Sequence, residues 1–222
     1  MNNITKVLFT ILIGLVIYTL WPLESGRSPV TIHVWDAHIN TQGHLNVLDV
    51  VLGETTLKQA EAILLTQSER ALFLELNEGE PQSESIEAFF PTSPDRVQMI
   101  IELNAPDELL QRIKSRALRT IVFPSGSAKM TIAPEDMIDV EALTARSITY
   151  IPNTALDIAL VTQHFGQAKQ QIRDNDNNLH LLYPALGLDV VLPPKGKPLL
   201  QFVPPDQFDR LLLRLPMTTS DQ

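Results

Sequence analysis

An uninterrupted apolar run near the start of the chain is its longest hydrophobic feature. Residues 7–23 form 17 consecutive positions without a charge. That length is near the minimum for crossing about 30 Å of hydrocarbon at about 1.5 Å per residue. No favourable pair of small residues follows Leu23, so we expect an uncleaved signal anchor, with a cleaved signal peptide as the alternative. Lys6 makes the short flank positive, which predicts a cytoplasmic amino terminus and a periplasmic body at a bacterial inner membrane.

Beyond this run, hydrophobic positions alternate with polar ones in several stretches, as they do in half-buried strands. Four short strands are predicted late in the chain, at 168–173, 179–183, 188–192 and 199–203. The clearest period of two comes earlier, in three stretches whose shared faces hold Leu72, Leu74 and Leu76, then Ile86, Ala88 and Phe90, then Val97, Met99, Ile101 and Leu103.

Apolar positions spaced three and four apart predict helices between these strands, and an amphipathic stretch at 207–215 closes the pattern. The helices begin at recognisable signals: a capping box at Thr56 and Gln59, a first-turn proline at Pro106, and a capping pattern from Thr154 to Asp157 whose helix stops at Gly166.

The order of a helix followed by an antiparallel meander occurs twice, which predicts the α+β class. We expect an N-terminal transmembrane helix followed by two small helix-plus-antiparallel-meander modules. The predicted parts are a signal anchor over 1–23, a linker over 24–29, a first module over 30–142 and a second module over 143–222.

Charge and composition narrow the classes of partner. The chain carries 17 basic and 26 acidic residues, a net charge of −9, so it lacks the basic surface that nucleic acid binding requires. The absence of cysteine excludes disulfides, thiolate metal sites and thiol nucleophiles.

A family resemblance covers the second module. Residues 154–166 form a predicted helix that ends in glycine, and the strands after it carry Leu182-Tyr-Pro184 and Gly187-Leu-Asp-Val190. This order resembles the BamE (SmpA/OmlA-type) fold family over about 153–203 and, more faintly, over 48–103. The resemblance implies a helix followed by a small meander and a role in supporting outer-membrane protein assembly. The family's usual lipid anchor needs a cysteine, which this chain lacks.

Few residues suggest chemistry. His33, Asp36, His38 and His44 gather at a predicted hairpin, and imidazole with carboxylate suits Zn²⁺ or Ni²⁺. The alternative is that they are polar residues at a hairpin near the membrane. His180 alternates with leucines, which places it on the outer face of its strand, and no carboxylate partner is apparent.

These observations predict a protein that is not an enzyme and holds no cofactor. We expect an accessory subunit or assembly factor of an envelope complex, tethered by its N-terminal helix and bound to an envelope or inner-membrane protein. The alternative is an extracytoplasmic sensor module for a small molecule or metal. Partner contacts are expected on the second faces of the strands, where apolar residues mark binding surfaces, at Phe89, Ile100 and Leu182.

Overall fold

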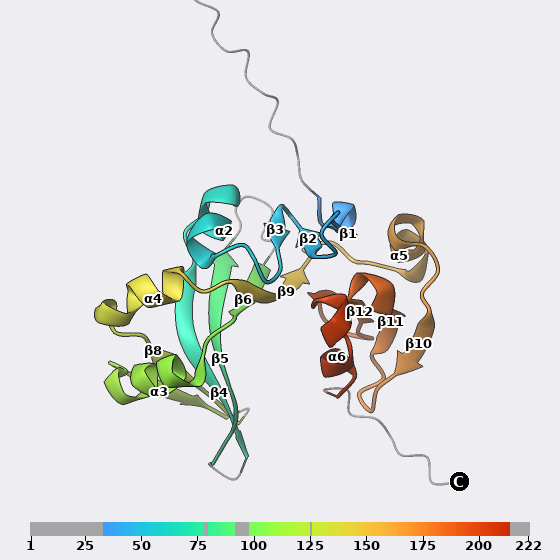
Figure 1. The fold of residues 1–222 in the computed structure, drawn as a ribbon. Helices are drawn as coiled ribbons and strands as arrows, with labels where there is room; N and C mark the ends of the chain where they lie inside the picture. Colours follow the sequence, from blue (N-terminus) through green and yellow to red (C-terminus); the bar gives the residue numbers. More distant parts are fainter. Residues whose placement is uncertain (1–32, 78–79, 92–97, 125, 214–222) are drawn as a thin grey trace, which may run out of the picture. The chain divides into compact units, whose positions relative to one another are not determined.

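A computed structural model of the chain describes residues 33–77, 80–91, 98–124 and 126–213. All of these residues belong to one unit that begins at His33. The unit is built around one long antiparallel sheet with helices packed against it (Figure 1). The fold is therefore predominantly β.

Ten strands form this sheet in the order β10-β11-β12-β13-β9-β6-β5-β4-β8-β7. Strand β9 joins its two halves, because it pairs with β6 on one side and with β13 on the other. The bounds are β4 Glu69–Asn77, β5 Glu80–Pro91, β6 Gln98–Leu103, β7 Thr120–Phe123, β8 Ser127–Thr131, β9 Ala145–Ile151, β10 Gln170–Arg173, β11 Leu179–Tyr183, β12 Leu188–Leu192 and β13 Leu199–Phe202.

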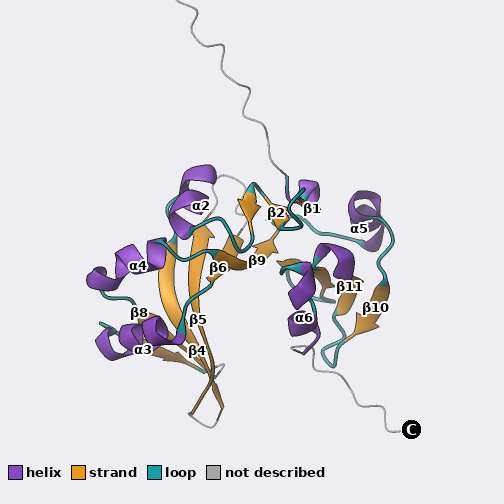
Figure 2. Cartoon of the chain, in the orientation of Figure 1, coloured by secondary structure: helices purple, strands orange, loops and turns teal. Residues whose placement is uncertain are grey.

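A second, three-stranded sheet and several short helices complete the described fold (Figure 2). The small sheet consists of β1 His38–Ile39, β2 Leu45–Val47 and β3 Val50–Val51. The α-helices are α2 Leu57–Ile63, α3 Asp107–Arg116, α4 Met137–Glu141, α5 Ile158–Phe165 and α6 Asp209–Leu213, and the 3-10 turns are η1 Val34–Asp36, η2 Pro134–Asp136, η3 Pro184–Leu186 and η4 Pro205–Gln207.

One face of the large sheet, here called the covered face, holds the main core. The neighbouring strands β4, β5, β6, β9 and β13 place fully buried side chains on it in an adjoining set. Helices α2 to α5 and the small sheet pack over this set, so that one hydrophobic cluster runs along the sheet. Burying each such side chain stabilises the fold by about 1.5–3 kcal/mol. The set is Leu72, Ile86, Ile101, Ile148 and Phe202.

The opposite face, here called the open face, has a second and much smaller cluster. Leu182 of β11 and Val203 pack there against Phe208 and Leu211, and the last of these belongs to α6. The short helix α6 therefore shields the part of the open face over β11 to β13, and its Arg210 reaches Glu102 of β6.

The single sheet corrects the predicted fold class. Two small α+β modules were expected, but β9 pairs with strands from both halves and the core cluster is continuous across them. The predicted order of helix then meander is present, in α2 with β4 to β6 and in α5 with β10 to β13. What the sequence pattern could not supply was the long-range pairing that fuses the meanders into one mostly β structure.

The predicted transmembrane segment lies outside the described residues. Among the residues that are described, no helix is long and apolar enough to cross a bilayer. The predicted transmembrane helix, signal anchor and single-pass inner-membrane placement have no counterpart among these residues, and none of them is carried further.

The predicted helix starts are partly confirmed. Thr56 is the N-cap of α2, and its side chain and that of Gln59 complete the expected capping box. Helix α5 begins one turn later than predicted, because Asp157 is the N-cap and accepts a hydrogen bond from the backbone N–H of Leu160 at 2.7 Å. Gly166 ends α5 as expected.

Candidate functional site

The open face of β4, β5 and β6 carries two groups of apolar side chains, and the strand register places Glu87 and Glu102 between them. Phe89 on β5 lies directly opposite Ile100 on β6, and both are half-buried. Phe73 on β4 shares this face, and the outermost strand β7 adds Ile121 and Phe123, which are 36% and 38% exposed. We call these five residues the apolar strip. Among the described residues, none of these five packs into either of the hydrophobic clusters that helices form with the sheet.

Two of the three predicted partner contacts belong to this strip. The structure brings Phe89 and Ile100 together as a cross-strand pair, which is the unit of side-chain contact on a sheet face. The third, Leu182, is only 1% exposed because α6 covers it. Leu182 is therefore a core residue, and its prediction as a surface contact is corrected.

A groove of about 340 Å³ lies on the open face beside the apolar strip. Phe73 belongs to the strip and also lines the groove. Glu102 of β6 lies in its wall. The carboxylate of Glu102 accepts a hydrogen bond from Ser147 Oγ at 3.0 Å and lies 3.4 Å from guanidinium nitrogens of Arg146 and Arg210. Arg210 belongs to α6, so this ion cluster marks the place where the helix begins to shield the face.

Serine hydroxyls hold two other carboxylates of the groove. Ser83 Oγ donates to Glu75 at 2.6 Å, and Ser85 Oγ donates to Glu87 at 3.1 Å. No histidine is among the described residues that line the groove, so the hydroxyl–imidazole pair of nucleophilic catalysis does not form there. The groove offers a polar, charged border to the apolar strip.

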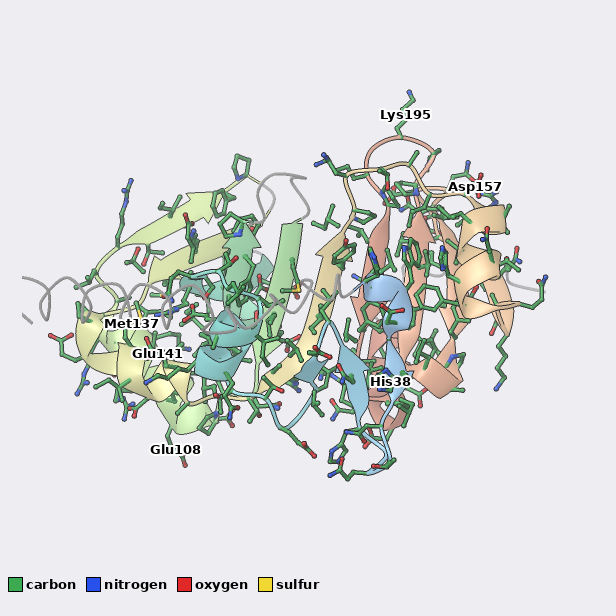
Figure 3. The ribbon with its side chains drawn as sticks, turned by 90° about the horizontal axis from the view of Figure 1, so that it is seen from above. His38, Glu108, Met137, Glu141, Asp157 and Lys195 are labelled. Atoms are coloured by element: carbon green, nitrogen blue, oxygen red, sulfur yellow. The ribbon has the colours of Figure 1, made fainter. Side chains whose placement is uncertain are left out.

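The predicted metal ligands are not brought together. Asp36 Oδ2 accepts the backbone N–H of His33 at 3.1 Å, and His38 Nδ1 lies 2.8 Å from the backbone oxygen of Asp36. His44 pairs instead with Glu54. Within the described ranges, no group of three or more histidine, aspartate or glutamate side chains is arranged to hold a metal ion. Figure 3 shows His38 on the small sheet, in line with the alternative interpretation of these residues as polar hairpin positions.

A buried histidine cluster lies on the other half of the open face. His180 of β11 is 4% exposed. Its Nδ1 is 2.8 Å from Asp189 of β12, and its Nε2 is 3.4 Å from Asp174 in the turn before β11. The expectation that His180 lacks a carboxylate partner is wrong. Asp189 lies two residues from Val191, the residue directly opposite His180, so strand alternation could have placed both on one face.

The two carboxylates favour the charged form of the imidazole. Burial lowers the pKa of His180, but the hydrogen bonds and negative charges of Asp189 and Asp174 outweigh burial and raise it above its ordinary value. Burial raises the pKa of Asp174, but hydrogen bonds from Asn178, His180 and the backbone outweigh that effect and lower it. Because both ring nitrogens of His180 lie against carboxylates, the cluster joins the turn at Asp174 to β12 and leaves neither nitrogen open to a substrate.

This cluster predicts a pH-dependent stability. The raised pKa of His180 means that its contribution is complete below about pH 6.5 and is lost as pH rises through the folded-state value. The lowered pKa of Asp174 means that its contribution is lost only as pH falls through its own folded-state value. Melting temperature measured from pH 5 to 9 should therefore fall on the alkaline side.

The His180→Gln variant isolates this effect, with the exposed His38→Gln as its matched control. We expect the alkaline fall to flatten in the first variant and to persist in the second. Each kcal/mol lost corresponds to about 2–4 °C for a domain of this size. An equally steep fall in His180→Gln and in the wild type would contradict the assignment.

Comparisons with protein-family models, with curated proteins and with solved structures found no match. The BamE-type resemblance is therefore still a prediction from the sequence, and the geometry of the open face is the basis for a function.

Proposed function

We propose that this chain is a non-enzymatic accessory subunit or assembly factor that binds a protein partner through the apolar strip. The observation that carries the proposal is the exposure of this strip beside a shielded half of the same sheet face. Apolar side chains that are half-buried in the free protein gain about 25 cal/mol per Å² when a partner covers the rest of their surface.

The composition of the surface supports a protein partner. Protein interfaces combine aromatic residues at the centre with a polar rim, and aromatic and arginine residues dominate their binding energy. Here Phe73 and Phe89 supply the aromatic side chains, and Arg146 and Arg210 line the groove that Phe73 borders. The net charge of −9 disfavours nucleic acid as the partner.

A small-molecule sensor is the second candidate, and the groove is the observation that favours it. Its volume of about 340 Å³ falls at the lower end of the range for ligand pockets. Several of its charged groups, however, already pair with one another, as Glu102 does with Arg146. If the groove binds a small ligand, that ligand raises the melting temperature as its concentration increases. If the apolar strip binds a protein, only the partner protein raises it.

The proposal is tested by purifying the tagged full chain with its bound proteins. We expect one stoichiometric partner with the wild type. In the double variant Phe89→Glu/Ile100→Glu, recovery of that partner should fall roughly 30-fold or more, the loss expected when hot-spot contacts worth about 2 kcal/mol are removed. The cause is the burial of two unpaired carboxylates at the centre of the interface.

Ile138→Glu is the matched control, because Ile138 is an equally apolar surface residue on α4 and is 79% exposed. Helix α4 packs on the covered face, so this variant should keep the partner in full. Thermal unfolding of each variant checks that the fold is intact. Retention of the partner by the double variant, or a wild-type chain that purifies without any partner, would refute the proposal.

A further inference from the structure

Strand β7, Thr120–Phe123, is the last strand at one end of the large sheet. All four of its residues are exposed, and Val122 is 64% exposed. The segment Thr-Ile-Val-Phe combines high β propensity with no charge. An edge of this kind is a ready template for pairing with another extended chain.

The other end of the same sheet is built differently. Strand β10, Gln170–Arg173, reads Gln-Gln-Ile-Arg, and Lys169 precedes it. Polar and charged side chains are the usual protection of an edge strand against unwanted pairing. Strand β7 lacks this protection, so the two ends of one sheet differ in the feature that decides whether an edge accepts a further strand.

The backbone of β7 presents unused hydrogen-bonding groups at this edge. Thr131 donates its N–H to the carbonyl of Arg119 at 2.8 Å, which fixes the register of the ladder between β8 and β7. Because bonded residues alternate along an antiparallel strand, Ile121 and Phe123 bond to β8. Thr120 and Val122 therefore direct their N–H and C=O groups away from the sheet.

The edge also carries positive charge, in a chain whose net charge is −9. Lys129 of β8 lies directly opposite Ile121, and Arg119 precedes β7 on the same face by strand alternation. The Nζ atom of Lys129 lies 6.0 Å from the centroid of the Phe73 ring. No carboxylate among the described residues pairs with Arg119 or Lys129.

We propose that an extended segment of a partner protein pairs with β7 as an eleventh strand of the sheet. Its residues opposite Ile121 and Phe123 are apolar, and a carboxylate lies on the same face next to Arg119 and Lys129. This inference rests on the proposed function and specifies how the partner is held. Backbone pairing supplies affinity, and the alternating side chains supply specificity.

A second copy of the chain fits this edge less well. Pairing β7 with β7 of another copy around a two-fold axis opposes the segment 119–123 with itself. That segment, Arg-Thr-Ile-Val-Phe, contains no acidic residue, so self-pairing brings no carboxylate to Arg119. Cross-strand pairs of opposite charge stabilise a sheet, and only a partner of different sequence supplies them here.

The test uses the full chain and two fluorescent peptides in which valine and threonine alternate. One peptide has glutamate at both ends, and the other has lysine. Fluorescence anisotropy should show binding of the glutamate peptide and at least tenfold weaker binding of the lysine peptide. The double variant Arg119→Glu/Lys129→Glu should reverse this preference.

Val122→Pro removes the outward N–H of β7 and should weaken binding of the glutamate peptide at least tenfold. Proline is compatible with an edge strand when its nitrogen faces away from the sheet, so β7 and β8 should stay paired. Val122→Thr keeps the N–H and should bind as the wild type does. Unfolding curves establish that each variant folds, and the charge reversal tests the proposal independently of Val122→Pro.

The peptide experiment is separable from the test of the apolar strip. Phe89→Glu/Ile100→Glu leaves β7 intact and should bind the glutamate peptide normally while losing the whole partner. The inference is overturned if the wild type binds neither peptide, if Val122→Pro binds as well as Val122→Thr, or if the edge proves to hold a second copy in a dimer that Val122→Pro dissociates.

Discussion

Replacing Arg70 with alanine is expected to lower the free energy of unfolding by about 3–5 kcal/mol, the cost of leaving a buried charge without its partner. Arg70 lies on β4, on the covered face, and its guanidinium pairs with Glu61 of α2 and Glu141 of α4. Glu61 is only 6% exposed and also accepts hydrogen bonds from Ser68. Figure 3 shows Glu141 and Met137 on α4, the helix to which Arg70 joins α2.

Chemical denaturation measures this loss of stability, and the size of the loss should depend on pH. Burial raises the pKa of Glu61, but hydrogen bonds from Arg70 and Ser68 and the charge of Arg70 outweigh burial and lower it. The stability from this group is therefore present above its unfolded value, about pH 4.3, and is lost as pH falls through the folded-state value. The difference between wild type and Arg70→Ala should shrink in acid.

Two further variants separate the charge from the packing. Glu141→Gln removes the more exposed partner and should cost about 1 kcal/mol or less, as partly exposed ion pairs do. The double variant Arg70→Met/Glu61→Leu removes both buried charges and should recover much of the loss. If Arg70→Ala costs no more than Glu141→Gln, the buried pair does not hold α2 to the sheet.

Replacing Gly187 with alanine should destabilise the other half of the sheet by a comparable amount. Gly187 has a φ of +68° between η3 and β12, and its carbonyl accepts the N–H of Val203 at 2.9 Å. A Cβ there would lie 1.9 Å from the carbonyl oxygen of Val203. The left-handed backbone costs roughly 1–2 kcal/mol and the overlap about 1–3 kcal/mol or more, so the sum is about 2–5 kcal/mol.

Gly43→Ala is the control for the backbone cost alone. Gly43 also has a positive φ, +88°, but a Cβ at this position would have no atom within 4 Å. We expect its melting temperature to fall by no more than a few degrees, because each kcal/mol corresponds to about 2–4 °C. Equal losses in the two variants would show that the contact between Gly187 and Val203 is not tight in solution.

The alternation of apolar and polar residues predicts a strand well where one face of that strand is buried in the core. Leu72 and Leu74 follow the period of two and lie on the covered face as expected. Arg70 occupies the same face two residues earlier, and nothing in the pattern indicates that two glutamates from distant helices neutralise it. The pairing of β9 with both β6 and β13 is also invisible locally, since it depends on contacts between residues far apart in the chain.

In the candidate site too, the sequence pattern predicts the face on which a residue lies but not what packs over it. Alternation placed Phe89 and Ile100 on the second face of their strands, and they meet there. It placed Leu182 on that face too, but whether a residue stays exposed depends on where α6 packs, which amphipathic spacing does not specify. A turn separates His180 from Asp189 in the sequence. The register of β11 and β12 shows that the two residues are neighbours in space.

Site-specific photo-crosslinking in living cells tests the central claim most directly. A photoreactive phenylalanine analogue replaces Phe89 in one chain and Ile138 in another, so that the open face and α4 are probed in parallel. If the partner binds the apolar strip, position 89 gives one discrete adduct that is lost when Ile100→Glu is added, and position 138 gives none. An adduct from position 138 with none from position 89 would contradict this claim.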